Sequence, residues 1–178
     1  MSDSNRAAQA AQWWRRMQPN FENGSRNPFG DRAGLARLRR CATITEAMQE
    51  AATIELFRAL KLHDVAQLED VALAAGVLAT VRTAEVGGQS FPRAIGPDSP
   101  DKPETAIMKP IRFRRLMEAE TPTERLTVYR RAVALAGYTA NLHSLAEALL
   151  GWNDGLRTRW IFDYWNAADR PATALTNT

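Results

Sequence analysis

The chain has 178 residues, of which 45% are apolar and 24% are charged, and these proportions are typical of a globular protein of about one domain. Its single cysteine, Cys41, excludes an intramolecular disulfide framework and a multi-cysteine zinc site. The apolar runs are far shorter than the ~20 residues that span a bilayer, and the first residues lack the pattern of a secretory signal. We therefore expect a cytoplasmic protein that does not associate with a membrane.

The sequence predicts an all-α fold, because Ala, Leu, Arg and Glu dominate and no stretch alternates apolar and polar residues as a strand does. Pro19 ends the first predicted helix, and the Gly-, Pro- and Asn-rich segment 19–30 is expected to be a loop. Thr43 and Glu46 form a Thr-x-x-Glu capping box, which predicts the start of a long helix. The helices expected in this half of the chain cover 5–18, 31–41, 43–62 and 65–83.

Segment 86–105 interrupts the helical pattern. It holds three glycines and four prolines, which predict a long ordered loop between two helical lobes. Beyond it, Thr121 and Glu124 form a second capping box, and Gly137 is a good helix terminator. The helices expected here cover 108–119, 121–137, 141–150 and 153–167. The chain is thus divided into an N-terminal lobe at 1–85, a connecting loop at 86–105, a C-terminal lobe at 106–167 and a flexible tail at 168–178.

Motifs for catalysis are missing from the sequence. His63 and His143 are far apart, and neither has a Cys, His or acidic residue at ligand spacing, so no metal site is predicted. Neither a glycine-rich phosphate loop nor a nucleophile-elbow motif occurs. Nearby arginines favour a reactive thiolate at Cys41, but we expect the more common case of a small buried side chain. The sequence therefore predicts a protein that is not an enzyme and that needs no cofactor.

Trp152, Trp160 and Trp165 are expected to be core residues that order the last helix. Trp160 and Trp165 follow helical spacing with Leu156, which favours core packing over base stacking for them. Trp13 and Trp14 are adjacent and cannot both point inward on one narrow stripe, so we expect one of them at an interface.

Arginine accounts for 20 of the 23 cationic side chains. Its planar guanidinium grips phosphate with two hydrogen bonds and stacks on bases, although a GC-rich genome also favours arginine codons. Five arginines occupy 26–40 against Asp31 alone, and KPIRFRR at 109–115 has four cations and no acid. A solvated charged face is one interpretation of these clusters. Clusters on different helices would repel one another unless an external polyanion lay between them, so we predict binding to the backbone of nucleic acid.

The order of several segments resembles a known family. They are WW at 13–14, DRAGLARLRR at 31–40, SFPRAIG at 90–96, RFRRLMEAETPTERLTVYRRAVALA at 112–136 and LLGWNDGLRTRWIFDYW at 149–165. This succession is similar to that of the CasB family, the small subunit of the type I-E CRISPR effector complex called Cascade. The resemblance extends over nearly the whole chain.

The resemblance implies a two-lobed helical protein without catalytic activity. In that family two copies form a head-to-tail pair beside the CRISPR RNA and the target strand, and they hold the displaced DNA strand of the R-loop. The other Cascade subunits are then partners as well. The arginines that match the motifs are Arg39, Arg40, Arg93, Arg114, Arg115, Arg130 and Arg131. The charge argument alone adds Arg32, Arg37, Lys109 and Arg112 to the predicted nucleic-acid-binding residues.

Two other functions fit the same residues. One is a purely structural subunit whose arginines bind acidic surfaces of its partners. The salt dependence of binding to single-stranded DNA separates this function from nucleic-acid binding. The other is a small helical transcription regulator, which would need a helix-turn-helix, and no clear short turn between paired helices is evident.

Overall fold

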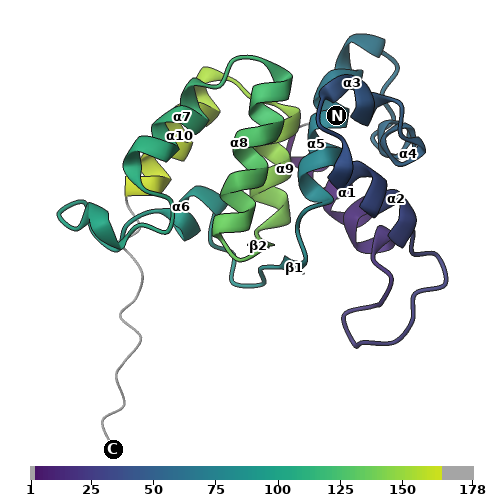
Figure 1. The fold of residues 1–178 in the computed structure, drawn as a ribbon, viewed down its shortest axis with the longest axis horizontal. Coiled ribbons are helices and arrows are strands. Elements are labelled where there is room, and N and C mark those ends of the chain that lie inside the picture. Colours follow the sequence, from purple (N-terminus) through teal and green to yellow (C-terminus); the bar gives the residue numbers. More distant parts are fainter. Residues whose placement is uncertain (1–2, 166–178) are drawn as a thin grey trace, which may run out of the picture.

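The computed structural model describes residues 3–165, which form an all-α fold, as predicted (Figure 1). Its α-helices are α1 (Asp3–Met17), α2 (Arg32–Arg40), α3 (Ile44–Met48), α4 (Ala51–Ala59), α5 (Leu68–Leu78), α6 (Phe91–Ile95), α7 (Pro110–Glu118), α8 (Pro122–Leu135), α9 (Leu142–Leu150) and α10 (Asp154–Trp165). Short 3-10 helices cover Val65–Gln67 and Pro103–Thr105. Strands β1 (Thr83–Ala84) and β2 (Thr139–Ala140) pair in parallel, with Thr83 opposite Thr139. Within 3–165, no helix is both long enough and apolar enough to cross a membrane.

The centre of the molecule is α5, which is buried on every side from Val71 to Leu78. A helix that is apolar all round is stable only in the interior. It packs against α8 and α9, and α1 packs along α9. In Figure 1, α2, α3 and α4 lie at one end of the molecule, and α6, α7 and α10 lie at the other. One cluster of buried apolar side chains runs from Ala7 to Tyr164 and crosses segment 86–105. The division into two lobes remains a prediction.

Helix starts and ends follow the local signals that were predicted. The Thr121 hydroxyl accepts from the Glu124 backbone N–H at 3.2 Å, and the Glu124 carboxylate accepts from the Thr121 N–H, so this capping box is complete. The hydrogen bond from the Thr121 backbone N–H to the carboxylate is the largest cause of the lowered pKa of Glu124. Gly137 has a φ of +67° just beyond α8, where a left-handed terminator was expected. At the start of α9 the Asn141 side chain accepts from the Ser144 N–H at 2.9 Å.

The helix predicted over 43–62 is wrong in one respect, because the chain breaks it into α3 and α4. Glu50 adopts extended backbone angles between the two helices. The buried Thr53 hydroxyl donates to the Ala47 carbonyl at 2.6 Å and so satisfies a backbone group that the break leaves open. The turn lets both short helices pack on α5, α3 also reaching α8 and α4 also reaching α1. Burial against α5 thus overrides the continuous helical pattern.

Segment 86–105 is ordered, but it is not all loop. SFPRAIG forms the five-residue helix α6, which packs against α10. Phe91 and Ile95 are fully buried, and the Phe91 ring centroid lies 6.1 Å from that of Trp160. Burial of these two side chains stabilises a helix where the glycines and prolines alone predict none.

The burial of the tryptophans differs from the prediction in both directions. Trp160 is 2% exposed, which confirms it as a core residue. The same prediction is wrong in part for Trp152 and Trp165, which are only half-buried where they pack against the core. The expectation that Trp13 or Trp14 lies at an interface is wrong, since both are buried. Because α1 contacts α9 and α4, it buries more than one narrow stripe, and the Trp14 indole N–H donates to the Val81 carbonyl at 3.3 Å.

Candidate nucleic-acid interface

Three of the predicted arginines line one groove between α7 and α8. The groove has a volume of about 580 Å³, and we call it the arginine groove. Its charged residues are Arg112 and Arg115 from α7 and Arg131 from α8. Its apolar lining consists of Met108, Val128, Ala134 and Leu135.

Amphipathic helices bring these arginines together. In α7, Phe113, Leu116 and Met117 are buried, as predicted from their spacing. Arg112 and Arg115 are three residues apart, so they project from the same face of the helix, away from the core. In α8, the buried face holds Leu126, Tyr129, Ala132 and Val133, which leaves Arg131 exposed.

The arginine groove is electropositive. Arg112, Arg115 and Arg131 are all exposed, and none of them forms an ion pair with another residue of 3–165. No acidic side chain lines the groove. Like charges held close together without a counter-charge raise the local potential and attract anions. A groove lined by these three arginines can bind successive phosphate groups of one nucleic-acid strand.

Arg114 lies on a different surface from Arg115. Consecutive residues of an α-helix are about 100° apart around its axis. Arg114 is exposed, but it lines a second groove with residues of α10 and the start of α8. The arginine pair of the sequence is therefore split between two surfaces.

Arg130 does not lie at solvent as the sequence argument assumed. Its guanidinium donates to the backbone carbonyls of Leu38 at 2.6 Å, Cys41 at 2.5 Å and Gly76 at 3.1 Å. Burial lowers the pKa of the Arg130 side chain. The residue therefore links α8 to the end of α2 and to α5. We leave it out of the candidate interface.

The arginines of α2 have separate roles. Arg37 pairs with Glu50 at 2.9 Å and so connects α2 to the residue before α4. The Arg39 guanidinium donates to the Ala79 carbonyl, and burial, with Arg82 and Arg32 nearby, lowers its pKa. Arg32 and Arg40 are exposed and make no ion pair within the described chain. They lie at opposite ends of α2, and α2 is at the other end of the molecule from α7 (Figure 1), so neither joins the arginine groove.

The remaining predicted cations lie near the start of α7 and on α6. Lys109 is exposed, and its ammonium group donates to the backbone carbonyl of Glu104. Arg93 is half-buried on α6. Neither residue lines the arginine groove.

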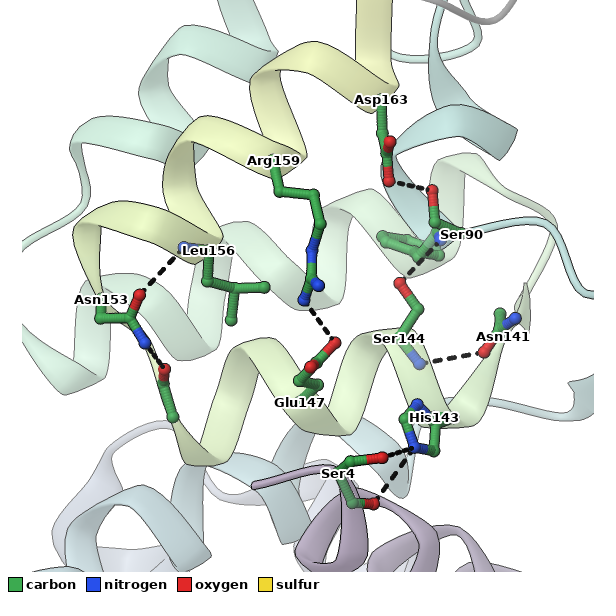
Figure 2. A network of polar contacts seen from close by, with 12 residues as sticks. Ser4, Ser90, Asn141, His143, Ser144, Glu147, Asn153, Leu156, Arg159 and Asp163 are labelled. Atoms are coloured by element: carbon green, nitrogen blue, oxygen red, sulfur yellow. Dashed lines mark hydrogen bonds and ion pairs between the residues drawn. The ribbon is translucent and has the colours of Figure 1, made fainter. Parts of the chain in front are cut away.

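The described residues hold no group of three or more metal-ligating side chains. Cys41 is buried, and desolvation raises its pKa, as is usual for an inert thiol. Serine, histidine and aspartate side chains lie near one another beside α9, but the hydrogen bonds in Figure 2 do not link all three types in one chain. Ser90 donates to Asp163 at 2.7 Å, whereas the His143 ring bonds to Ser4. The Ser4 Oγ does lie 3.3 Å from the His143 Nε2, but the Asp163 carboxylate accepts from Ser90 and not from this histidine, so the orienting third group of a hydrolase triad is missing from the pair within the described chain.

Sequence reasoning missed the apolar lining of the groove. Val128 and Leu135 share one face of α8, but Met108 comes from the segment before α7, and no local pattern marks it as their neighbour. Leu135 and the nearby Ile111 are 37% and 57% exposed, which a helical pattern alone does not predict. The groove is therefore visible only once α7 has packed against α8.

Comparison with known proteins identifies the family. No curated protein and no solved structure matches the chain. A family described as CRISPR-associated protein Cse2 matches residues 34–165, which is most of the chain. This is the family that the sequence motifs resemble, and the match includes α7, α8 and the arginine groove. The chain therefore belongs to the CRISPR-associated Cse2 family, whose members are subunits of the Cascade complex.

Proposed function

We propose that this Cascade subunit holds nucleic acid by its backbone in the arginine groove and thereby stabilises the R-loop without catalysing a reaction. The displaced DNA strand is the ligand that we favour. In this proposal the subunit also contacts the region of the CRISPR RNA and the target strand. A second copy of the chain and the other Cascade subunits complete the basic surface.

The observation that carries the proposal is the convergence of Arg112, Arg115 and Arg131 on one groove without an acidic residue. Arginine contacts to phosphate position a strand but do not read its sequence. This property suits a subunit that must hold any displaced strand, because RNA pairing supplies the specificity in such complexes.

The energetic need is small. Exchange of a DNA duplex for an RNA–DNA duplex is nearly balanced, so a few contacts to the displaced strand can tip it. A Lys or Arg that neutralises a phosphate releases counterions, and this release makes the binding strongly salt-dependent. Backbone contacts of this kind need neither a metal nor a titrating group.

The test replaces Arg112 and Arg131 together by alanine, one from each wall of the groove. Binding to mixed-sequence single-stranded DNA is measured over a range of salt concentrations, for the chain alone and within the assembled complex. On a plot of log binding constant against log salt concentration, each phosphate contact to a single strand steepens the slope by about 0.7. The slope of the double variant should therefore be shallower than that of the wild type by about 1.4. All sequences should weaken alike.

A matched control removes two exposed arginines elsewhere, Arg15 and Arg58. It has the same net charge as the groove variant and should keep the full slope. If the groove variant keeps the wild-type slope but no longer assembles, its arginines bind acidic protein surfaces, and the structural alternative is correct. Strand cleavage during the titrations would contradict the non-catalytic part of the proposal.

A further inference from the structure

A second groove lies on the other side of α7. It has a volume of about 720 Å³ and is bounded by α7, the start of α8 and α10. We call it the tryptophan groove. Its basic residues are Arg114, Arg125 and Arg157, and its aromatic walls include Trp152 and Trp165.

Arg125 is the unusual residue of this groove. It is only 8% exposed, although arginine is a cationic residue that is rarely buried. One terminal nitrogen donates to the Ala148 carbonyl at 3.2 Å, but the buried Nε has no hydrogen-bond partner among the described residues. None of their carboxylates lies within 4.0 Å of its guanidinium. A buried cation without a paired anion is unfavourable, and an anionic group bound in the groove would supply the missing charge.

The neighbouring acids limit how much negative charge the groove accepts. Asp70 of α5 interacts with Arg125 at longer range, and burial raises the pKa of this aspartate despite that arginine. Glu118 and Glu120 line the groove at the end of α7. Asp154 also pairs with Arg157 at 3.5 Å, so three arginines face three carboxylates and the groove carries little net charge. That balance suits one phosphate group better than a run of phosphates.

The aromatic walls indicate what the phosphate is attached to. The guanidinium carbons of Arg125 and Arg157 lie 5.7 Å and 6.0 Å from the centroid of the Trp152 ring, so cation and ring surfaces are interleaved. Flat aromatic and guanidinium surfaces stack on nucleobases. The volume is also within the range of small-ligand sites, which is about 300–1,000 Å³.

We propose that the tryptophan groove binds one nucleotide unit, with its phosphate on Arg125 and Arg157 and its base against the tryptophan walls. The unit is either a free nucleotide or one unpaired nucleotide of a strand. The second source rests on the proposed function, because a strand in the arginine groove runs along the same helix, α7.

The experiment measures binding of deoxyadenosine 5′-monophosphate by calorimetry, with deoxyadenosine and inorganic phosphate as separate probes. The full nucleotide should bind the wild-type chain at least tenfold more tightly than either part. Arg157→Ala should weaken nucleotide binding about tenfold, since it removes one charged contact. The matched control is Arg159→Ala on the same helix, because Arg159 pairs with Glu147 at 2.9 Å outside this groove (Figure 2). It should bind like the wild type.

Single-stranded DNA separates the two sources and the two proposals. If Arg157→Ala weakens only strand binding, the nucleotide belongs to a strand; if it weakens binding of the free nucleotide, the free source is supported. If Arg157→Ala weakens neither kind of binding, while the Arg112→Ala, Arg131→Ala double variant still weakens strand binding, this inference fails and the proposed function stands.

The inference also fails if Arg157→Ala prevents assembly of the complex but changes neither nucleotide binding nor strand binding. The groove would then bind an acidic segment of a partner protein. If only Arg157→Ala has an effect, the arginine groove is not the strand site.

Discussion

Arg130 and Arg131 are adjacent in α8, yet we predict opposite consequences for their replacement by alanine. Arg130 holds three backbone carbonyls, at Leu38, Cys41 and Gly76. Arg131 is exposed and lines the arginine groove. Arg130→Ala should therefore reduce stability without changing the salt slope of strand binding, and Arg131→Ala should do the reverse.

The size of the Arg130 effect follows from its contacts. A hydrogen bond to a charged group contributes about 1.5–3 kcal/mol, and this guanidinium makes three of them. Two effects make the expected loss of stability smaller than the sum of three such bonds. Burial lowers the pKa of Arg130, so desolvation of the charge offsets part of the gain. Water can also reach some of the freed carbonyls at the end of α2. We expect a loss of about 3 kcal/mol, which lowers the melting temperature by about 6–12 °C in a chain of this length.

Urea and thermal unfolding measure the first effect, and salt titration with single-stranded DNA measures the second. Arg131→Ala should change the free energy of unfolding by about 0.5 kcal/mol or less, as exposed substitutions usually do. It should lower the salt slope by about 0.7. The reasoning is refuted if Arg130→Ala melts like the wild type and lowers the slope. That result would mean that the guanidinium faces the ligand instead of the three carbonyls.

Two further predictions concern the aromatic core. Trp160→Ala should cost about 3–5 kcal/mol in urea unfolding because the indole is buried, and an unchanged midpoint would return Trp160 to the candidates for base stacking. The Tyr164 hydroxyl donates to the Met108 carbonyl at 2.7 Å, and burial raises the pKa of Tyr164 to about 12. The fold thus favours the neutral phenol. Its contribution to the free energy of unfolding is complete below the unfolded pKa of about 10, and this contribution is lost as the pH rises towards 12. Tyr164→Phe should flatten this fall in stability, and an identical pH profile for both proteins would contradict the assignment.

Helix starts were predictable because their causes are local. A side-chain acceptor such as Thr121 or Asn141 bonds to an N–H three residues ahead, whatever the rest of the chain does. Breaks inside helical patterns were not predictable in this way. The turn at Glu50 and the short helix α6 both depend on burial against elements that are distant in sequence.

The contacts of each arginine side chain were the feature that the sequence predicted least well. A run of arginines in the sequence shows where positive charge is concentrated, but the tertiary structure determines which groups each arginine contacts. Arg37 finds Glu50 on a neighbouring segment, and Arg130 finds carbonyls of residues that are more than fifty positions away. Arg125 belongs to none of the sequence clusters, yet it is 8% exposed and has no carboxylate within 4.0 Å among the described residues. Clustering in sequence therefore identifies a basic protein but does not identify its binding surface.

The position of α7 between two grooves changes how its arginines should be tested. Replacing Arg114 and Arg115 together is the natural experiment from the sequence, because the two are adjacent. In the structure this pair removes one cation from the tryptophan groove and one from the arginine groove. A single loss of binding could then arise on either side of the helix. Variants that pair Arg112 with Arg131, and that treat Arg157 alone, each change one groove and leave the other intact. Only such variants can assign a phosphate contact to one face of α7.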